Sequence, residues 1–149
     1  MAIRLGDVAP RGFLRVVNDQ RGKMPEGQSG RLELARWLTD VDQGAGRVAA
    51  RVLANRIWQW YFGKGLVRTA GDFGRQGEAP SHPELLDYLA VVFMEKGWSL
   101  KALHREVMLS ASYQLSSEPN PENERKDADN RFLWRMNRSR LDIESWRDA

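Results

Sequence analysis

The sequence predicts a mostly α fold, namely a compact bundle of four or five helices with one long ordered loop at residues 64–80. Apolar residues recur at the three- and four-residue spacings of amphipathic helices in several segments. Ser or Pro precedes these segments and Gly follows them, which is the order in which helices begin and end. No segment alternates apolar and polar residues for long enough to predict a sheet.

The composition is that of one soluble domain able to form its own core. The chain has 149 residues, of which 42% are apolar, and it includes six Trp. Charged residues make up 29%, and the formal net charge is +3. So small an excess of positive charge favours solubility over nucleic-acid binding.

Several kinds of site are excluded because the sequence has no Cys. Disulfides, thiolate metal sites, a Cys nucleophile and the Cys-x-x-Cys-His haem motif are all ruled out. The first seven residues lack the apolar segment of a signal peptide. No window approaches the roughly 20 apolar residues that a membrane-spanning helix needs.

The first two elements are an irregular segment at residues 1–29 and a helix over residues 31–38. Pro10, Pro25 and scattered glycines interrupt any period in the irregular segment. Ser29 is the expected N-cap of the helix, whose apolar face includes Trp37.

The strongest helix is predicted over residues 48–62, with Gly63 ending it. Its expected apolar stripe consists of Ala49, Val52, Leu53, Ile57, Trp60 and Tyr61. A separate polar row is formed by Arg51, Asn55 and Gln59. The loop at residues 64–80 contains four Gly, and loops of this length are often functional.

Two further helices are expected on either side of a short turn. Ser81 and Glu84 form a predicted capping box for a helix ending near Lys96, where Gly97 stops it. Ser99 begins the next helix, which extends to about residue 115. Trp98 should fold back on this helix pair, and Trp98→Ala should cost about 3–5 kcal/mol if the ring is buried.

The C-terminal third is predicted to be an acidic linker followed by a short apolar element and a truncated helix. Residues 117–130 carry five acids against Arg125 and Lys126, a net charge of −3. The chain thus divides into an N-terminal segment (1–29), a helical core (30–116), a linker (117–130) and a C-terminal element (131–149). The core is expected to contain Trp37, Leu53, Ile57, Trp58, Leu89, Phe93, Leu103 and Val107.

The polar residues around the long loop form the candidate catalytic site. His82 at a helix N-terminus is a chemically sensible general base, since that position favours a neutral imidazole. In this hypothesis His82 or Glu84 activates water, Asp72 orients it or supplies the second carboxylate, and Arg56 stabilises developing negative charge. The alternative is that His82 only caps the helix and binds the loop.

The same residues also have structural interpretations. Ser81 and His82 resemble a nucleophile and base, but neighbours on a turn rarely face each other, so capping is favoured. Arg56 is expected to pair with an acid of the last helix, such as Glu144 or Asp148. The side chains of Asn55 and Gln59 are expected to bind the loop backbone or to floor a polar pocket, and Asp87 lies nearby as a further binding candidate.

Metal and nucleic-acid binding are weaker hypotheses. His104 has apolar neighbours four residues to either side, which is typical of a packed His. No His-containing metal motif is present, so neither a metal nor another cofactor is expected. The alternative is a Ca²⁺ or Mg²⁺ site built of loop oxygens, which needs no such motif. The arginines near Trp134 and Trp146 are diluted by acids, so a nucleic-acid partner is not expected.

Short phrases between residues 55 and 113 resemble a known family. They are Asn55-Arg56-Ile57-Trp58-Gln59, Phe62-Gly63-Lys64-Gly65-Leu66-Val67-Arg68-Thr69, Asp72-Phe73-Gly74, Pro80-Ser81-His82-Pro83-Glu84-Leu85-Leu86-Asp87 and Gly97-Trp98-Ser99-Leu100-Lys101. Residues 29 to 149 resemble PSD1, or DUF1553, a domain of unknown function at the C-terminal end of large planctomycete proteins. One departure from the family pattern is the glycine-rich stretch before the strongest helix, at residues 42–47.

The resemblance implies a domain of a longer, exported protein, so the chain is expected to be a fragment. The leading hypothesis is a non-catalytic helical module for interaction or assembly, whose partners are upstream domains of the same protein or further copies of itself. The alternative is a small hydrolase that cleaves an ester, phosphoester or glycosidic bond at the site described above.

Overall fold

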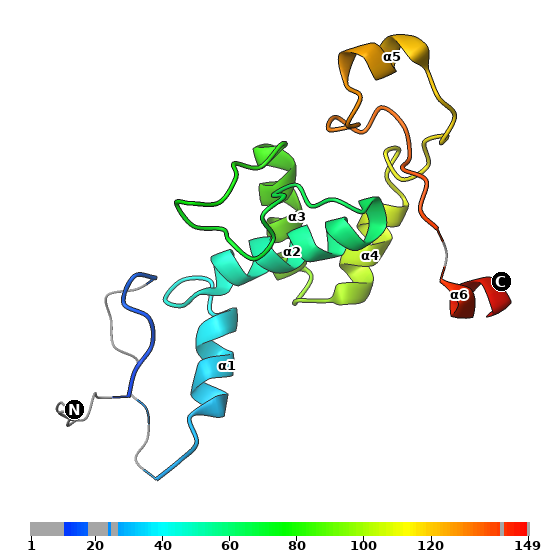
Figure 1. Cartoon of the computed structure of the whole chain (residues 1–149). Helices are drawn as coiled ribbons and strands as arrows, with labels where there is room; N and C mark the ends of the chain where they lie inside the picture. The colour runs from blue at the N-terminus through cyan, green and yellow to red at the C-terminus, as the bar shows by residue number, and fades with distance from the viewer. Residues whose placement is uncertain (1–10, 18–23, 25–26, 141, 149) are drawn as a thin grey trace, which may run out of the picture. The chain divides into compact units, whose positions relative to one another are not determined.

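The computed structural model describes residues 11–17, 24, 27–140 and 142–148, and within them the protein is helical (Figure 1). The mostly α prediction is therefore confirmed. In chain order the helices are α1 (Arg31–Thr39), α2 (Gly46–Phe62), α3 (Pro83–Glu95), α4 (Leu100–Met108), α5 (Pro121–Lys126) and α6 (Ile143–Asp148).

The chain divides into two compact units, residues 1–49 and 50–149, with the border inside α2. In the first unit Trp37 stacks on Phe13, with ring centroids 5.1 Å apart. The N-cap of α1 is Gly30, with φ of 79°, in place of the predicted Ser29. Ser29 instead accepts a 3.4 Å hydrogen bond from the N–H of Arg31 through its hydroxyl.

The glycine-rich stretch before α2 is a tight turn, and the turn explains its composition. The carboxylate of Asp40 accepts hydrogen bonds from the N–H groups of Asp42 and Gln43, both at 2.9 Å. A Cβ on Gly44 would lie 2.1 Å from the carbonyl oxygen of Trp37. Only Gly fits at position 44, and the tight turn leads directly into α2. The helix begins at Gly46, two residues before the predicted start.

The buried face of α2 differs from the predicted stripe. Leu53 and Trp60 are 39% and 75% exposed, so both were wrongly assigned to the stripe, and Leu53 wrongly to the core. The buried face instead includes Ala50, Ala54 and Asn55 beside its large apolar residues. A prediction from the spacing of large apolar side chains alone therefore misplaces part of this face. The buried residues of α2 in the second unit are Ala50, Ala54, Asn55, Ile57, Trp58 and Phe62.

The core of the second unit is formed by α2, α3, α4 and part of the long loop. Of the residues predicted for it, six are buried there: Ile57, Trp58, Leu89, Phe93, Leu103 and Val107. Leu66 and Val67 of the loop are buried in the same cluster. Tyr61 of α2 reaches α4 through a 2.7 Å hydrogen bond between its hydroxyl and Nδ1 of His104. His104 is thus a packed, hydrogen-bonded residue.

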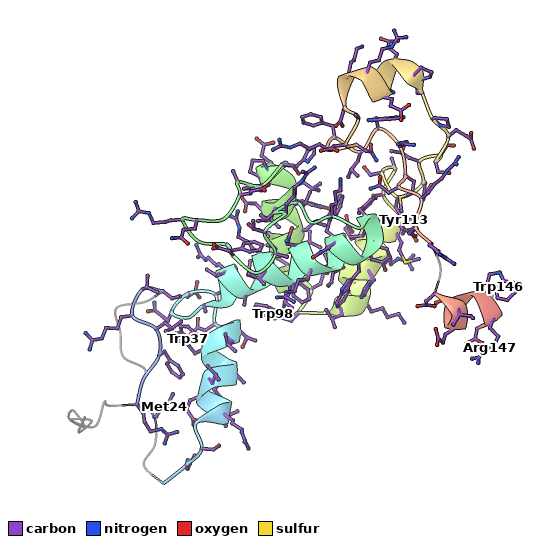
Figure 2. All side chains as sticks on the ribbon, in the orientation of Figure 1. Met24, Trp37, Trp98, Tyr113, Trp146 and Arg147 are labelled. Atoms are coloured by element: carbon purple, nitrogen blue, oxygen red, sulfur yellow. The ribbon has the colours of Figure 1, made fainter. Side chains whose placement is uncertain are left out.

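The turn between α3 and α4 has the form that the sequence predicts. The N–H of Gly97 bonds the carbonyl of Met94, and the N–H of Trp98 bonds that of Phe93, which is a Schellman motif. Trp98, labelled in Figure 2, is half-buried and packs its ring on Phe93 at 5.2 Å. Ser99 then caps α4 as predicted, because its hydroxyl accepts from the N–H of Ala102.

The C-terminal third is more structured than its composition indicates. The acidic segment contains α5, which Asn120 caps by accepting from the N–H groups of Glu122 and Asn123. α4 ends at Met108, before the predicted end near residue 115. Across the part of the chain that the structure describes, no helix has the length and apolar character needed to cross a membrane.

Candidate functional site

Asn55 attaches the long loop to α2. Its side chain is fully buried, its Nδ2 donates to the carbonyl of Val67 at 3.0 Å, and its Oδ1 accepts from the N–H of Val67 at 2.8 Å. A Cβ on Gly65 would lie 2.8 Å from this amide. Asn55 therefore binds the loop backbone, which was one of the two roles expected for it.

The loop is ordered by its own polar side chains. The carboxylate of Asp72 accepts from the N–H of Gly74 at 2.8 Å. The hydroxyl of Thr69 donates to the carbonyl of Asp72 and accepts from the N–H of Glu78. Among the described residues, Asp72 makes no hydrogen bond or ion pair with His82, and its hydrogen bonds are to Thr69 and Gly74 of the loop.

His82 and Ser81 face each other at the start of α3. Nδ1 of His82 lies 3.0 Å from the hydroxyl oxygen of Ser81, although neighbours on a turn rarely face each other. The predicted capping box with Glu84 is not formed, because His82 is the N-cap residue and its side chain makes no capping hydrogen bond. The imidazole also meets Phe132 edge to face, with centroids 5.8 Å apart.

The remaining candidates lie on the surfaces of α2 and α3. Asp87 forms an ion pair with Arg51 at 2.5 Å. Glu84 and Arg56 are exposed, and Gln59 is half-buried. Arg56 forms no ion pair with Glu144, Asp148 or any other acid in the described ranges. The expected partnership of Arg56 with the last helix is therefore not found; its side chain is exposed and does not require a partner.

A small pocket lies where the loop meets the segment after α5. Its volume is about 30 Å³, and it is partly open to solvent. Ser81, Lys64 and Arg68 line it from the loop side, and Asn130 and Arg131 from the other. None of the four predicted catalytic residues lines this pocket; these are Arg56, Asp72, His82 and Glu84.

Asn130 and Asn137 were not predicted, yet they hold the C-terminal segment against α2. Asn130 is 5% exposed with φ of 50°, and its Nδ2 donates to Oδ1 of Asn137 at 3.0 Å. Asn137 in turn donates to the carbonyl of Phe62 at 2.9 Å, at the end of α2. The only sequence signal for Asn130 is that Asn tolerates positive φ better than most residues do.

Trp60 and its neighbours form an exposed face on α2. Leu53, Arg56 and Trp60 are spaced three and four residues apart and so lie on one side of the helix. Trp60 is 75% exposed, whereas Trp58 of the same helix is only 4% exposed. We call Leu53, Arg56 and Trp60 the Trp60 face.

Metal binding has no support among the residues placed by the structure, where no group of three or more His, Asp or Glu side chains could hold an ion. The hydroxyl of Tyr61 is held by His104 and has its pKa raised, first by burial and then by the nearby Tyr113. Tyr61 is therefore a neutral hydrogen-bonding residue at physiological pH.

Comparison with known protein families identifies the family of this chain. Residues 30–149 match the family model described as PSD1, a protein of unknown function (DUF1553). This match covers most of the chain and includes the loop, Asn55, Ser81 and His82. Neither a curated protein nor a solved structure matches the chain.

Proposed function

The chain belongs to the PSD1 (DUF1553) family, and we propose that it is a non-catalytic helical module for interaction or assembly within a larger, exported protein of the planctomycete type. The observation that carries the proposal is the Trp60 face. An exposed Trp next to an exposed Arg that forms no ion pair with any described residue is unusual for a surface that contacts only water. Trp and Arg are enriched in protein interfaces and in the residues that dominate binding energy.

The local geometry supports an interface at this position. Helix α2 is fixed from its other side, since Asn55, Ile57 and Trp58 are buried against the core. The Trp60 face is therefore presented on a rigid element, and little conformational entropy is lost when a partner covers it. Among the described residues Arg56 forms no ion pair, so its guanidinium is free to meet a partner's carboxylate or carbonyl groups.

Sedimentation analysis of the purified chain over a range of concentrations tests the proposal through self-association. We expect a concentration-dependent dimer that Trp60→Ala weakens by about 2 kcal/mol, roughly thirtyfold in Kd. Trp146→Ala is the matched control, because Trp146 on α6 is 73% exposed but lies outside the Trp60 face. Monomers at every concentration, or equal weakening by both variants, would count against the proposal.

A hydrolase is the second candidate, and one observation favours it. Ser81 lines the small pocket, and its hydroxyl oxygen lies 3.0 Å from Nδ1 of His82. In this proposal His82 takes a proton from water, and Asp72 and Glu84 are the carboxylates of the site. A panel of ester, phosphoester and glycoside substrates separates the candidates. Activity that survives in both His82→Ala and Asp72→Asn would remove this site.

A further inference from the structure

The residues that line the pocket beside Ser81 carry more positive than negative charge. Three cationic side chains line it, those of Lys64, Arg68 and Arg131, against one carboxylate, that of Glu78. The lining groups therefore sum to a charge of +2 at neutral pH. Their positive charge is concentrated at one concave place on a chain whose net charge is only +3.

Two of the three cations, Lys64 and Arg131, form no ion pair in the described part of the chain. Arg68 pairs with the carboxylate of Asp129 at 3.6 Å. Lys64 only approaches the backbone carbonyl of Asp129, at 3.5 Å, and the guanidinium of Arg131 has no hydrogen bond or ion pair there. Arg131 acts on the carboxylate of Asp127 only through its charge, without an ion pair, so both cationic side chains can still contact an anion from outside.

The neutral polar groups of the pocket are already engaged by the protein. Nδ2 of Asn130 donates to the carbonyl of Arg135, Asn137 donates to that of Phe62, and Ser81 bonds His82. The rest of the lining is apolar and includes Trp58 and Leu66. A ligand in the pocket would therefore be held chiefly by the cations and would lie against a surface of low dielectric constant, where charge-assisted hydrogen bonds are stronger.

The pocket size limits the ligand to a small charged group. Its volume of about 30 Å³ exceeds the roughly 10–15 Å³ that one water needs, so it admits a group of a few atoms. An anion with two or more oxygens can accept hydrogen bonds from more than one cationic side chain of the pocket, which a monatomic anion cannot do as well.

We propose that this pocket binds a small oxyanion, a phosphate or a carboxylate, either as a free ion or as the end group of a larger ligand. Lys64 and Arg131 are its principal donors, Arg68 contributes a charge partly offset by Asp129, and Glu78 limits the affinity by repulsion. The pocket is partly open, so the remainder of a larger ligand stays outside. This inference does not depend on the Trp60 face.

Titration of the chain with sodium phosphate or sodium acetate, followed by amide and Arg side-chain NMR signals, tests the proposal. Sodium chloride at matched ionic strength separates specific binding from screening. We expect saturable shifts at Gly65, Ser81 and Arg131 with at least one oxyanion. Arg131→Gln and Lys64→Gln should each weaken binding about tenfold, as expected for loss of one charge-assisted hydrogen bond.

The matched control is Arg125→Gln, which removes the same charge from an exposed residue of α5 outside the pocket and should leave the affinity unchanged. Glu78→Gln should tighten binding, because it removes the opposing charge. Binding of phosphate alone, or of acetate alone, supports the proposal and identifies the end group. Identical shifts with chloride, no saturation, or equal weakening by Arg125→Gln and Arg131→Gln would overturn it.

Discussion

At the residue scale, a few buried or half-buried polar side chains determine how the long loop and the C-terminal segment are held. Asn55 pairs with both backbone groups of Val67 in a fully buried place. Asn130 and Asn137 connect the segment after α5 to the end of α2. Because buried polar groups are costly when unpaired, these amides determine which loop conformation is stable.

Replacing Asn55 tests this role. Asn55→Ala leaves the N–H and C=O of Val67 buried without partners, so the free energy of unfolding should fall by about 2–4 kcal/mol. Chemical denaturation of the variant measures this loss. Gln59→Ala, on the same helix but with no side-chain hydrogen bond to the described residues, should change stability by less than about 0.5 kcal/mol. Similar losses for both variants would contradict the assignment.

The carboxylate of Asp127 should make the stability of the protein depend on pH. Burial of this carboxylate by itself would raise its pKa. Hydrogen bonds from the N–H groups of Phe132 and Arg131 lower the pKa, and so do the positive charges of Arg131 and Arg68, so that the pKa lies below 3.8. A pKa that is lower in the folded state stabilises the protein above the unfolded value and loses this contribution as pH falls through the folded value.

Unfolding of wild type and Asp127→Asn, measured from neutral pH down to the acid range, checks this sign. The variant should be less stable at about pH 7, and the difference should shrink once the pH falls below 3.8. A difference that stays constant through the acid range would show that the carboxylate charge makes no such contribution.

At the element scale, the sequence predicts the helices well and their buried faces less well. Gly63, Gly97 and Ser99 mark helix ends correctly, because capping depends on local backbone geometry. The buried face of α2 could not be predicted in full, since it includes the small residues Ala50 and Ala54 and the polar Asn55, whose amide is hydrogen-bonded to the loop. The capping box at Ser81 failed for a local reason, because its hydroxyl bonds His82 instead of the helix backbone.

Trp98 is the element-scale test of the turn between α3 and α4. Its ring is half-buried on Phe93, so Trp98→Ala should lower the free energy of unfolding by about 2–3 kcal/mol, less than a fully buried Trp would. Thermal or denaturant unfolding gives the value. A loss below about 1 kcal/mol would show that the ring contributes no packing to the turn.

At the scale of the whole molecule, the family and the helical fold follow from the sequence, whereas the candidate sites follow only in part. The sequence singles out Asn55, which binds the loop, and the neighbours Ser81 and His82, whose side chains face each other. The cationic pocket could not be predicted, because Lys64 and Arg131 are 67 positions apart in sequence and meet only through the fold. Two members of the Trp60 face, Leu53 and Trp60, were assigned to the apolar stripe of α2 and are exposed, since exposure cannot be read from the spacing of large apolar residues.

The most direct measurement of the central claim is photo-crosslinking from a reactive amino acid placed at position 60, with the same amino acid at position 146 as control. Trp146 is equally exposed and lies on α6, as Figure 2 shows. If the Trp60 face is an interface, position 60 gives a defined crosslink to a second copy or to another domain of the longer protein, and position 146 does not. The absence of any crosslink from position 60, or equal and undefined crosslinking from both positions, would contradict the account.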